Sequence, residues 1–181
     1  MTAVRSRERR QEGVRIIERE LLDRVLAPYK PHCRYLQTAG VVGLGAGAGE
    51  IVAAEGEFAI PASCYIASTG HFNAVEFNIC YNQLAYYLLA VSAKYGLFEA
   101  MNGWSTEEFE RRQLSDFLIV QFSSTFRSPM RADRFNGRVA VESVRPHSSG
   151  VFLKTKCSFE DGLGGRSEGT ALLAIVGQHA A

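Results

Sequence analysis

The chain has 181 residues, of which 46% are hydrophobic and 22% are charged, and this balance is ordinary for a soluble domain with one core. Its 20 basic and 19 acidic residues give a net charge of +1, which excludes the strong basic bias of many nucleic-acid-binding and membrane-surface proteins. The sequence therefore predicts a single domain over residues 1–181, with no nucleic acid and no membrane among its partners.

The first predicted element is an amphipathic helix that follows a polar segment. Residues 1–13 carry four arginines with interspersed glutamates and predict a flexible, solvated tail. No apolar run of the kind found in signal peptides follows it. From Val14 to Leu26, apolar residues recur at helical spacing, and Pro28 marks the end of the helix.

Six segments further along the chain have the composition and flanking turn signals of strands. The first two are joined by the glycine-rich residues 45–49, which resemble a hairpin connection because no GK[ST] sequence follows, as a phosphate loop would require. The last four follow a short helix with a capping signal at Ser105. The predicted strands are 34–44, 50–60, 114–126, 135–145, 151–159 and 167–176.

A helix from about Asn73 to Tyr95 separates the first two strands from the last four, because neither Gly nor Pro interrupts the sequence before Gly96. It is apolar nearly all round, so most of its surface must be buried. Its longest unbroken apolar run, Leu84 to Val91, has eight residues, whereas a bilayer requires about 20. The helix is therefore expected to lie inside a protein core.

This order of elements describes an α+β hot-dog fold. We expect an antiparallel six-stranded sheet wrapped round a long central helix, with an additional N-terminal helix. Such a sheet leaves an edge exposed, and pairing of two edges predicts a homodimer or a higher homo-oligomer.

The cysteines and histidines form no metal-binding pattern. The four cysteines lack CxxC spacing and the four histidines lack HxxH or HxH spacing, so no metal site is predicted. Reduced thiols and the missing signal peptide predict a cytoplasmic location. Cys64 and Cys80 are interpreted as packing residues, because the sequence supplies no activating partner.

The residues before the long helix place His71, Asn73 and Glu76 at its mouth. The first turn of a helix presents unpaired N–H groups and the positive end of the macrodipole, which suit a developing thioester oxyanion. His71 and Glu76 are candidates for proton transfer there. The alternative is that these polar groups bond neighbouring backbone, which is the favoured interpretation for Asn78 and Asn82.

Several short motifs occur together in the chain. The most specific is Ser-Thr-Gly-His-Phe-Asn-Ala-Val-Glu at 68–76, and the others are Pro28-Tyr29, Cys33-Arg34-Tyr35-Leu36, Asn82-Gln83-Leu84-Ala85-Tyr86 and Phe126-Arg127 with Pro129. From about Leu21 to the C-terminus, the sequence resembles the fatty-acyl-CoA thioesterase type III family.

Members of that family are described as long-chain acyl-CoA thioesterases, but those of natural-product pathways are enoyl-acyl-carrier-protein glycyltransferases. The latter add the glycine amine to C3 of a 2-enoyl thioester. The resemblance implies that Tyr29, Tyr65 and Asn73 match active-site positions. It also implies an acyl carrier protein or CoA thioester and glycine as the partners of the enzyme.

Conjugate addition of glycine requires a base, donors for the thioester enolate and a cation for the glycine carboxylate. His71 or Glu76 is the candidate base, and the helix amides with Asn73 are the candidate enolate donors. Arg34 or Arg127 is the candidate carboxylate anchor, although a dimer ion pair or a phosphopantetheine phosphate is the favoured interpretation for Arg127. No cofactor is expected beyond the phosphopantetheine that the substrate carries.

The acyl chain is predicted to occupy an apolar tunnel alongside the central helix, lined by Phe77, Tyr81 and Leu84. Gln83, on the polar stripe of the same helix, completes the predicted substrate-binding set.

Three functions are compatible with these residues. The first is aza-Michael addition of glycine to C3 of a medium- or long-chain 2-enoyl thioester, giving an N-carboxymethyl-3-amino acyl product in natural-product biosynthesis. The second is hydrolysis of long-chain fatty acyl-CoA or acyl-carrier-protein thioesters, with Glu76 as nucleophile or base. The third is non-catalytic acyl binding.

Overall fold

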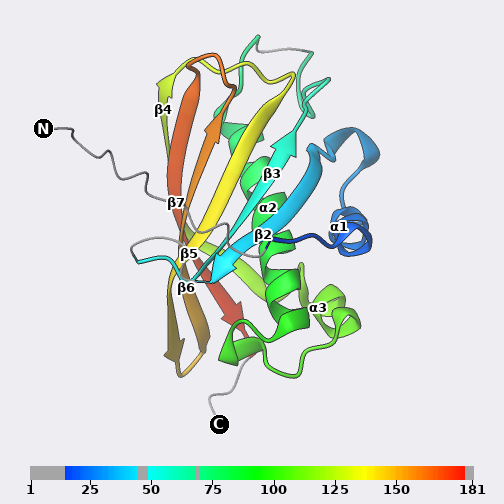
Figure 1. The fold of residues 1–181 in the computed structure, drawn as a ribbon, viewed down its shortest axis with the longest axis vertical. Helices are drawn as coiled ribbons and strands as arrows, with labels where there is room; N and C mark the ends of the chain where they lie inside the picture. The colour runs from blue at the N-terminus through cyan, green and yellow to red at the C-terminus, as the bar shows by residue number, and fades with distance from the viewer. Residues whose placement is uncertain (1–14, 45–48, 68–69, 178–181) are drawn as a thin grey trace, which may run out of the picture.

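The computed structural model describes residues 15–44, 49–67 and 70–177, which form one antiparallel sheet with helices packed against its inner face (Figure 1). The predicted tail over residues 1–13, most of the glycine-rich connection, and Ser68 and Thr69 of the helix-mouth motif lie outside these described residues. Among the helices of the described part, none is long and apolar enough to cross a bilayer.

The sheet has seven strands in the order β1-β2-β3-β5-β6-β7-β4, with every neighbouring pair antiparallel. Six of the strands correspond to the six predicted segments, and the predicted hot-dog architecture is confirmed. The strands are β1 (Arg15–Ile16), β2 (Leu36–Leu44), β3 (Val52–Phe58), β4 (Phe117–Ser128), β5 (Phe135–His147), β6 (Gly150–Glu160) and β7 (Arg166–Val176).

The seventh strand corrects two predictions, the number of strands and the start of the N-terminal helix. Residues 15–16 pair with residues 41–42 of β2, so the predicted helix start at Val14 is wrong. The edge of β2 offers unpaired backbone groups, and this short pairing satisfies them. The helix α1 (Arg19–Leu26) begins further along the chain, and its four apolar residues are all buried.

The central helix α2 (Ala74–Tyr95) has both ends defined by caps. Asn73 caps the N-terminus in an extended conformation, and Gly96 follows the last turn with a φ of 61°, a left-handed conformation that suits glycine. α2 packs against β2, β3 and β5, while α1 and the short helix α3 (Thr106–Arg112) lie beside it (Figure 1). The prediction of one long enclosed helix is confirmed.

Aromatic rings fill the space between the first turns of α2 and the sheet. The ring centroids of Phe77 and Phe159 are 4.9 Å apart, and those of Phe72 and Phe135 are 4.7 Å apart. Gly137 on β5 makes room for this layer, because a Cβ there would lie only 2.6 Å from the ring of Phe159. The N-terminal end of α2 is therefore closely packed against the sheet.

Candidate active site

Asn73 marks the mouth of α2, as predicted, and its side chain has a structural task. Its Oδ1 atom accepts hydrogen bonds from the N–H groups of Val75 at 3.0 Å and Glu76 at 3.2 Å. These bonds satisfy two of the unpaired donors in the first turn. An oxyanion at this position can therefore use only the Nδ2 group of the Asn73 side chain.

Glu76 is the buried acid of the site. It is 2% exposed, and its Oε2 atom has no hydrogen-bond partner among the described residues. A buried carboxyl oxygen without a hydrogen-bond partner destabilises the folded state. A residue with a purely structural role would not be expected to leave such a group unpaired. This makes Glu76 the strongest candidate in the structure for chemistry at the helix mouth.

Glu76 lies near a buried thiol and a buried phenol. Burial raises the pKa of the Cys80 thiol well above its usual value, and the charge of Glu76 adds to this effect. Burial also raises the pKa of the Tyr35 hydroxyl, with further contributions from Cys64, Cys33 and Glu76. Cys80 is therefore protonated at neutral pH, which supports its interpretation as a packing residue.

An open hollow of about 700 Å³ lies in front of the helix mouth. The structure brings His71, Asn73 and Arg127 together on its wall, whereas the buried Glu76 is not among the residues that line it. The N–H group of Phe72 donates to the carbonyl of Met130 at 3.0 Å, which fastens the mouth to the connection after β4. The open hollow thus lies between two segments that are far apart in the sequence.

The two candidate arginines have different surroundings. Arg127, at the hollow, donates from Nε to Oε1 of Glu168 at 2.9 Å, and both side chains are about half exposed. Arg34 donates to the carbonyls of Ala27 and Tyr29, each at 3.0 Å, and so satisfies the backbone after α1. Of the two, Arg127 is the one that the structure places at the helix mouth.

The two candidate tyrosines lie outside the residues that line the hollow. Tyr29 is largely buried, and this burial raises the pKa of its hydroxyl. The neighbouring Tyr86 and Cys80 make smaller contributions in the same direction. Tyr29 is therefore a neutral group that lies near Cys80 and Tyr86 of α2. Tyr65 is 50% exposed on the connection between β3 and α2.

The predicted substrate-binding residues of α2 are all fully buried. Phe77 belongs to the aromatic layer, Leu84 faces Gly56 of β3, and the Tyr81 hydroxyl lies 2.7 Å from Oγ1 of Thr155. Side chains packed in this way line no open tunnel in this conformation. Their role in substrate binding stays a prediction.

Gln83 connects α2 to the start of β2. Its Oε1 atom accepts from the N–H groups of Tyr35 at 3.0 Å and Leu36 at 2.9 Å, and its Nε2 atom donates to the carbonyl of Cys33 at 2.6 Å. The buried amide therefore holds three backbone groups of a neighbouring segment. Its predicted contact with substrate stays a prediction as well.

Sequence reasoning missed that one face of α2 is left partly uncovered. Val75 is 43% exposed, and Asn78, Ile79, Asn82 and Tyr86 are partly exposed along the same face. Asn82 donates to Asn78 at 2.9 Å. The amides at this spacing were the available signal, because polar residues on an otherwise apolar helix mark the side nearest solvent.

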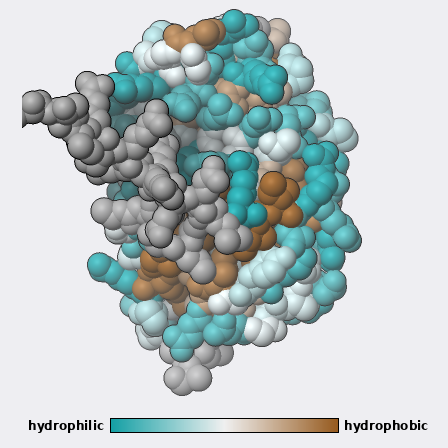
Figure 2. Space-filling model, viewed as in Figure 1, coloured by the Kyte–Doolittle hydropathy of each residue, from teal (hydrophilic) through white to brown (hydrophobic). Residues whose placement is uncertain are grey.

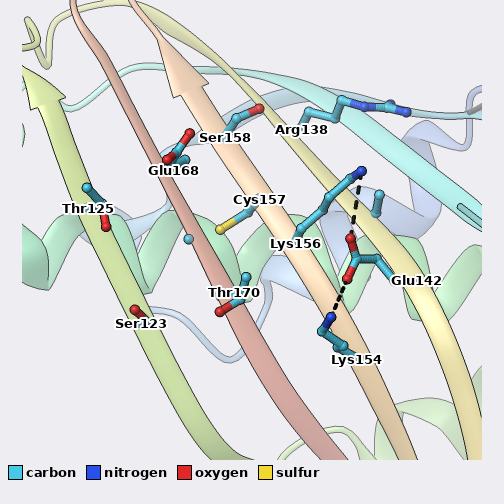
Figure 3. A pocket seen from close by; sticks show the side chains of 12 residues that line it. Ser123, Thr125, Arg138, Glu142, Lys154, Lys156, Cys157, Ser158, Glu168 and Thr170 are labelled. Carbon is cyan, nitrogen blue, oxygen red and sulfur yellow. Dashed lines mark ion pairs between the residues drawn. The ribbon is translucent and has the colours of Figure 1, made fainter. Parts of the chain in front are cut away.

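The outer face of the sheet carries a second hollow, of about 470 Å³, on the side opposite α2 (Figure 3). Figure 2 shows this face as mainly hydrophilic, with a hydrophobic area towards its lower end. Its charges are paired: Lys154 with Glu142 at 3.0 Å and Lys156 with Glu50 at 2.9 Å. Glu168 also lines this hollow, so its ion pair with Arg127 links the two hollows, but none of the lining residues has a buried side-chain nitrogen or oxygen without a partner.

Residues 24–175 match the FcoT-like thioesterase domain. The chain belongs to this family. Within the family, the chain is 45% identical over 161 residues to the (2E)-enoyl-[ACP] glycyltransferase of Streptomyces coeruleorubidus. The alignment covers 86% of this chain and 95% of that relative. It is 38% identical over 164 residues to the protein of the same name from Mycobacterium tuberculosis H37Rv, covering 88% of this chain and 87% of the relative.

A solved structure agrees with the fold. The FcoT-like chain is similar to a phenylacetic acid degradation-related protein from Ralstonia eutropha JMP134, with a TM-score of 0.50 and 14% sequence identity. The similarity covers 86% of this chain and 99% of the other. At this identity, the similarity concerns the fold alone.

Proposed function

We propose that this chain adds glycine to C3 of a (2E)-enoyl thioester carried by an acyl carrier protein. The observation that carries the proposal is the buried Oε2 atom of Glu76 in the first turn of α2, which has no hydrogen-bond partner among the described residues. The names of the relatives at 45% and 38% identity support the same reaction.

The reaction requires a neutral glycine amine, because an ammonium group has no lone pair. Glu76 or His71 takes a proton from the ammonium group. The amine nitrogen then forms a bond to C3, and the electron pair of the double bond moves towards the thioester oxygen. The Asn73 amide and a first-turn N–H group of α2 that the Asn73 oxygen does not already occupy stabilise this enolate, and a proton returned to C2 completes the product with the thioester bond intact.

Arg127 is the proposed contact for an anionic group of the substrates. Arg127 lines the hollow with His71 and Asn73, and its guanidinium, which pairs with Glu168, can exchange this partner for the glycine carboxylate or the phosphopantetheine phosphate. Arg34 is less suitable, because its N–H groups already serve two carbonyls. The addition changes no overall oxidation state, so it needs no redox cofactor. We propose that the enzyme uses no cofactor beyond the phosphopantetheine that the substrate carries.

A second copy of the chain is the proposed partner of β4, the edge strand beyond β7. Leu118, Ile119, Val120 and Phe126 on this strand are 38–55% exposed. Exposed apolar edges pair with other strands unless they are covered, so a homodimer removes this liability.

Thioester hydrolysis is the second candidate, because the matching family model is that of a thioesterase domain. In that reaction Glu76 activates a water molecule or attacks the thioester carbonyl, and the acyl group leaves its carrier.

An assay with enoyl-acyl carrier protein, with and without glycine, separates the candidates by mass spectrometry of the carrier. Glycine addition increases the mass of the acyl carrier by one glycine and leaves the thioester intact. Hydrolysis releases free acid whether or not glycine is present. Release of acid without any glycine adduct would overturn the proposed addition. Absence of both products would also overturn it and would favour non-catalytic acyl binding.

A further inference from the structure

The hollow in front of the helix mouth has an apolar side as well as polar groups. The candidate polar residues His71 and Asn73 line it together with apolar residues of two segments. These apolar residues are Phe72, Ala74, Phe126 and Pro129. An acyl thioester also combines a polar reacting group with an apolar chain, and binding sites for such ligands are lined by both kinds of surface.

Phe126 is the most exposed of the aromatic residues around the first turns of α2. It is 39% exposed, whereas Phe72 is 1% exposed and Phe77 is fully buried. The ring centroid of Phe126 lies 5.7 Å from that of Phe77 and 6.3 Å from that of Phe72. Phe126 therefore separates the open hollow from the buried aromatic layer. An apolar group that covers Phe126 gains free energy, because apolar surface leaves water.

The end of β4 is irregular where it meets the hollow. The pairing of β4 with β7 shifts register between Phe126 and Ser128. Such irregularities change the direction of side chains and are frequent beside active sites. The consecutive residues 126–129 all line the hollow. The position of Phe126 at the hollow is therefore a local feature of this strand end.

The ring behind Phe126 is held on several sides. The ring centroid of Phe77 lies 4.9 Å from that of Phe159 and 5.8 Å from that of Phe122. β7 approaches the same ring closely, because a Cβ at Gly169 would lie 3.0 Å from it. A ring packed in this way moves little when a neighbour is shortened, so removal of the Phe126 ring should leave space rather than allow collapse.

We propose that Phe126 sets the acyl chain length of the substrate. The chain lies in the hollow against the ring of Phe126, and this ring blocks its further entry towards Phe77. The identity of the ligand as an acyl thioester rests on the proposed function, whereas the binding of an alkyl chain can be measured without turnover.

A series of (2E)-enoyl carrier proteins of increasing chain length tests the proposal by turnover. Phe126→Ala should favour longer chains and raise the ratio of kcat/KM between the longest and the shortest substrate by roughly tenfold or more, the effect of a methylene in a hydrophobic pocket. Phe126→Leu should shift the preference in the same direction by less, and Phe126→Trp should shift it towards shorter chains.

Leu118→Ala is the matched control, because Leu118 is 45% exposed on the same edge strand and does not line the hollow. It removes apolar surface from β4 as Phe126→Ala does, and it should keep the wild-type chain preference. An equal shift in Leu118→Ala, or wild-type preference in all three Phe126 variants, would overturn the proposal.

Binding measurements separate this proposal from the proposed function. The probes are carrier proteins whose phosphopantetheine sulfur bears a saturated alkyl chain as a thioether, which can neither add glycine nor be hydrolysed. Calorimetric dissociation constants should show the same shift towards longer chains in Phe126→Ala. If wild-type protein forms no glycine adduct, the proposed function fails, while these constants still decide the role of Phe126. The same dependence on chain length in wild type and Phe126→Ala would contradict that role.

Discussion

The side-chain oxygen of Asn73 accepts the backbone N–H of Glu76 at 3.2 Å, so the residue that caps α2 also fixes the backbone of the buried acid. The cap and the candidate chemistry therefore share one side chain. Substitutions at Asn73 change both, and a pair of variants is needed to separate them.

Asn73→Ala is expected to lower the free energy of unfolding by about 1 kcal/mol, because the cap is lost. Asn73→Ser keeps a capping oxygen and adds no charge, so it should unfold close to wild type. If Nδ2 donates to the enolate, both variants should lose about 2–4 kcal/mol of transition-state stabilisation in kcat/KM. Urea unfolding and adduct formation on the same preparations measure the two effects. Wild-type turnover in Asn73→Ser would limit Asn73 to the cap.

Glu76→Gln is expected to reduce adduct formation by roughly 10²- to 10⁴-fold, the usual contribution of a general base. Its thermal stability should be close to that of wild type, because the amide has the volume of the carboxyl group and again leaves a buried polar atom at the position of Oε2. His71→Ala, at the exposed wall of the hollow, should also slow turnover with little effect on stability. Near-normal rates in both variants would remove these residues from the mechanism and indicate a substrate-assisted proton transfer.

Much of the fold could be predicted, because its helices and strands have clear hydrophobic patterns and are bounded by glycine, proline and other turn residues. The helix before Gly96 and the six main strands follow directly from such signals. The two-residue strand β1 could not be predicted, since its pairing depends on the free edge of β2 rather than on its own sequence. At the site, the sequence located His71, Asn73 and Glu76, but the contacts of Gln83 with three backbone groups depend on how the chain folds back upon itself.

Gln83→Ala is expected to lower the free energy of unfolding by about 2–4 kcal/mol, because it leaves buried backbone groups near Tyr35 without partners. Gln121→Ala, on the exposed surface of β4, is the matched control and should change stability by less than about 0.5 kcal/mol. Chemical unfolding measures both. A Gln83 variant with normal stability and a raised KM would instead support direct contact with substrate.

Val120→Lys is expected to convert a dimer into a monomer, because a charged side chain on an edge strand opposes pairing with a second copy. Val120 is 55% exposed at an irregularity in the pairing of β4 with β7. Leu163→Lys, 73% exposed in the β6–β7 connection, controls for the added charge and should leave the dimer intact. Sedimentation velocity distinguishes the species, and a monomeric wild-type protein would contradict the proposed dimer.

Acid should destabilise the protein partly through Glu50, whose side chain is 8% exposed. Burial opposes its charged form, but the contacts with Lys156 and Arg138 outweigh burial and hold the pKa of this carboxyl below its usual value. The unfolded chain then binds the proton more readily, so this stabilisation is present above the unfolded pKa and is lost as the pH falls through the folded pKa. Glu50→Gln should therefore be less stable than wild type at neutral pH and should lose less stability on acidification. Urea unfolding at pH 7 and at about pH 3 measures the difference, with Glu160→Gln as the exposed control. Parallel losses of stability in wild type and Glu50→Gln would show that this ion cluster does not set the acid response.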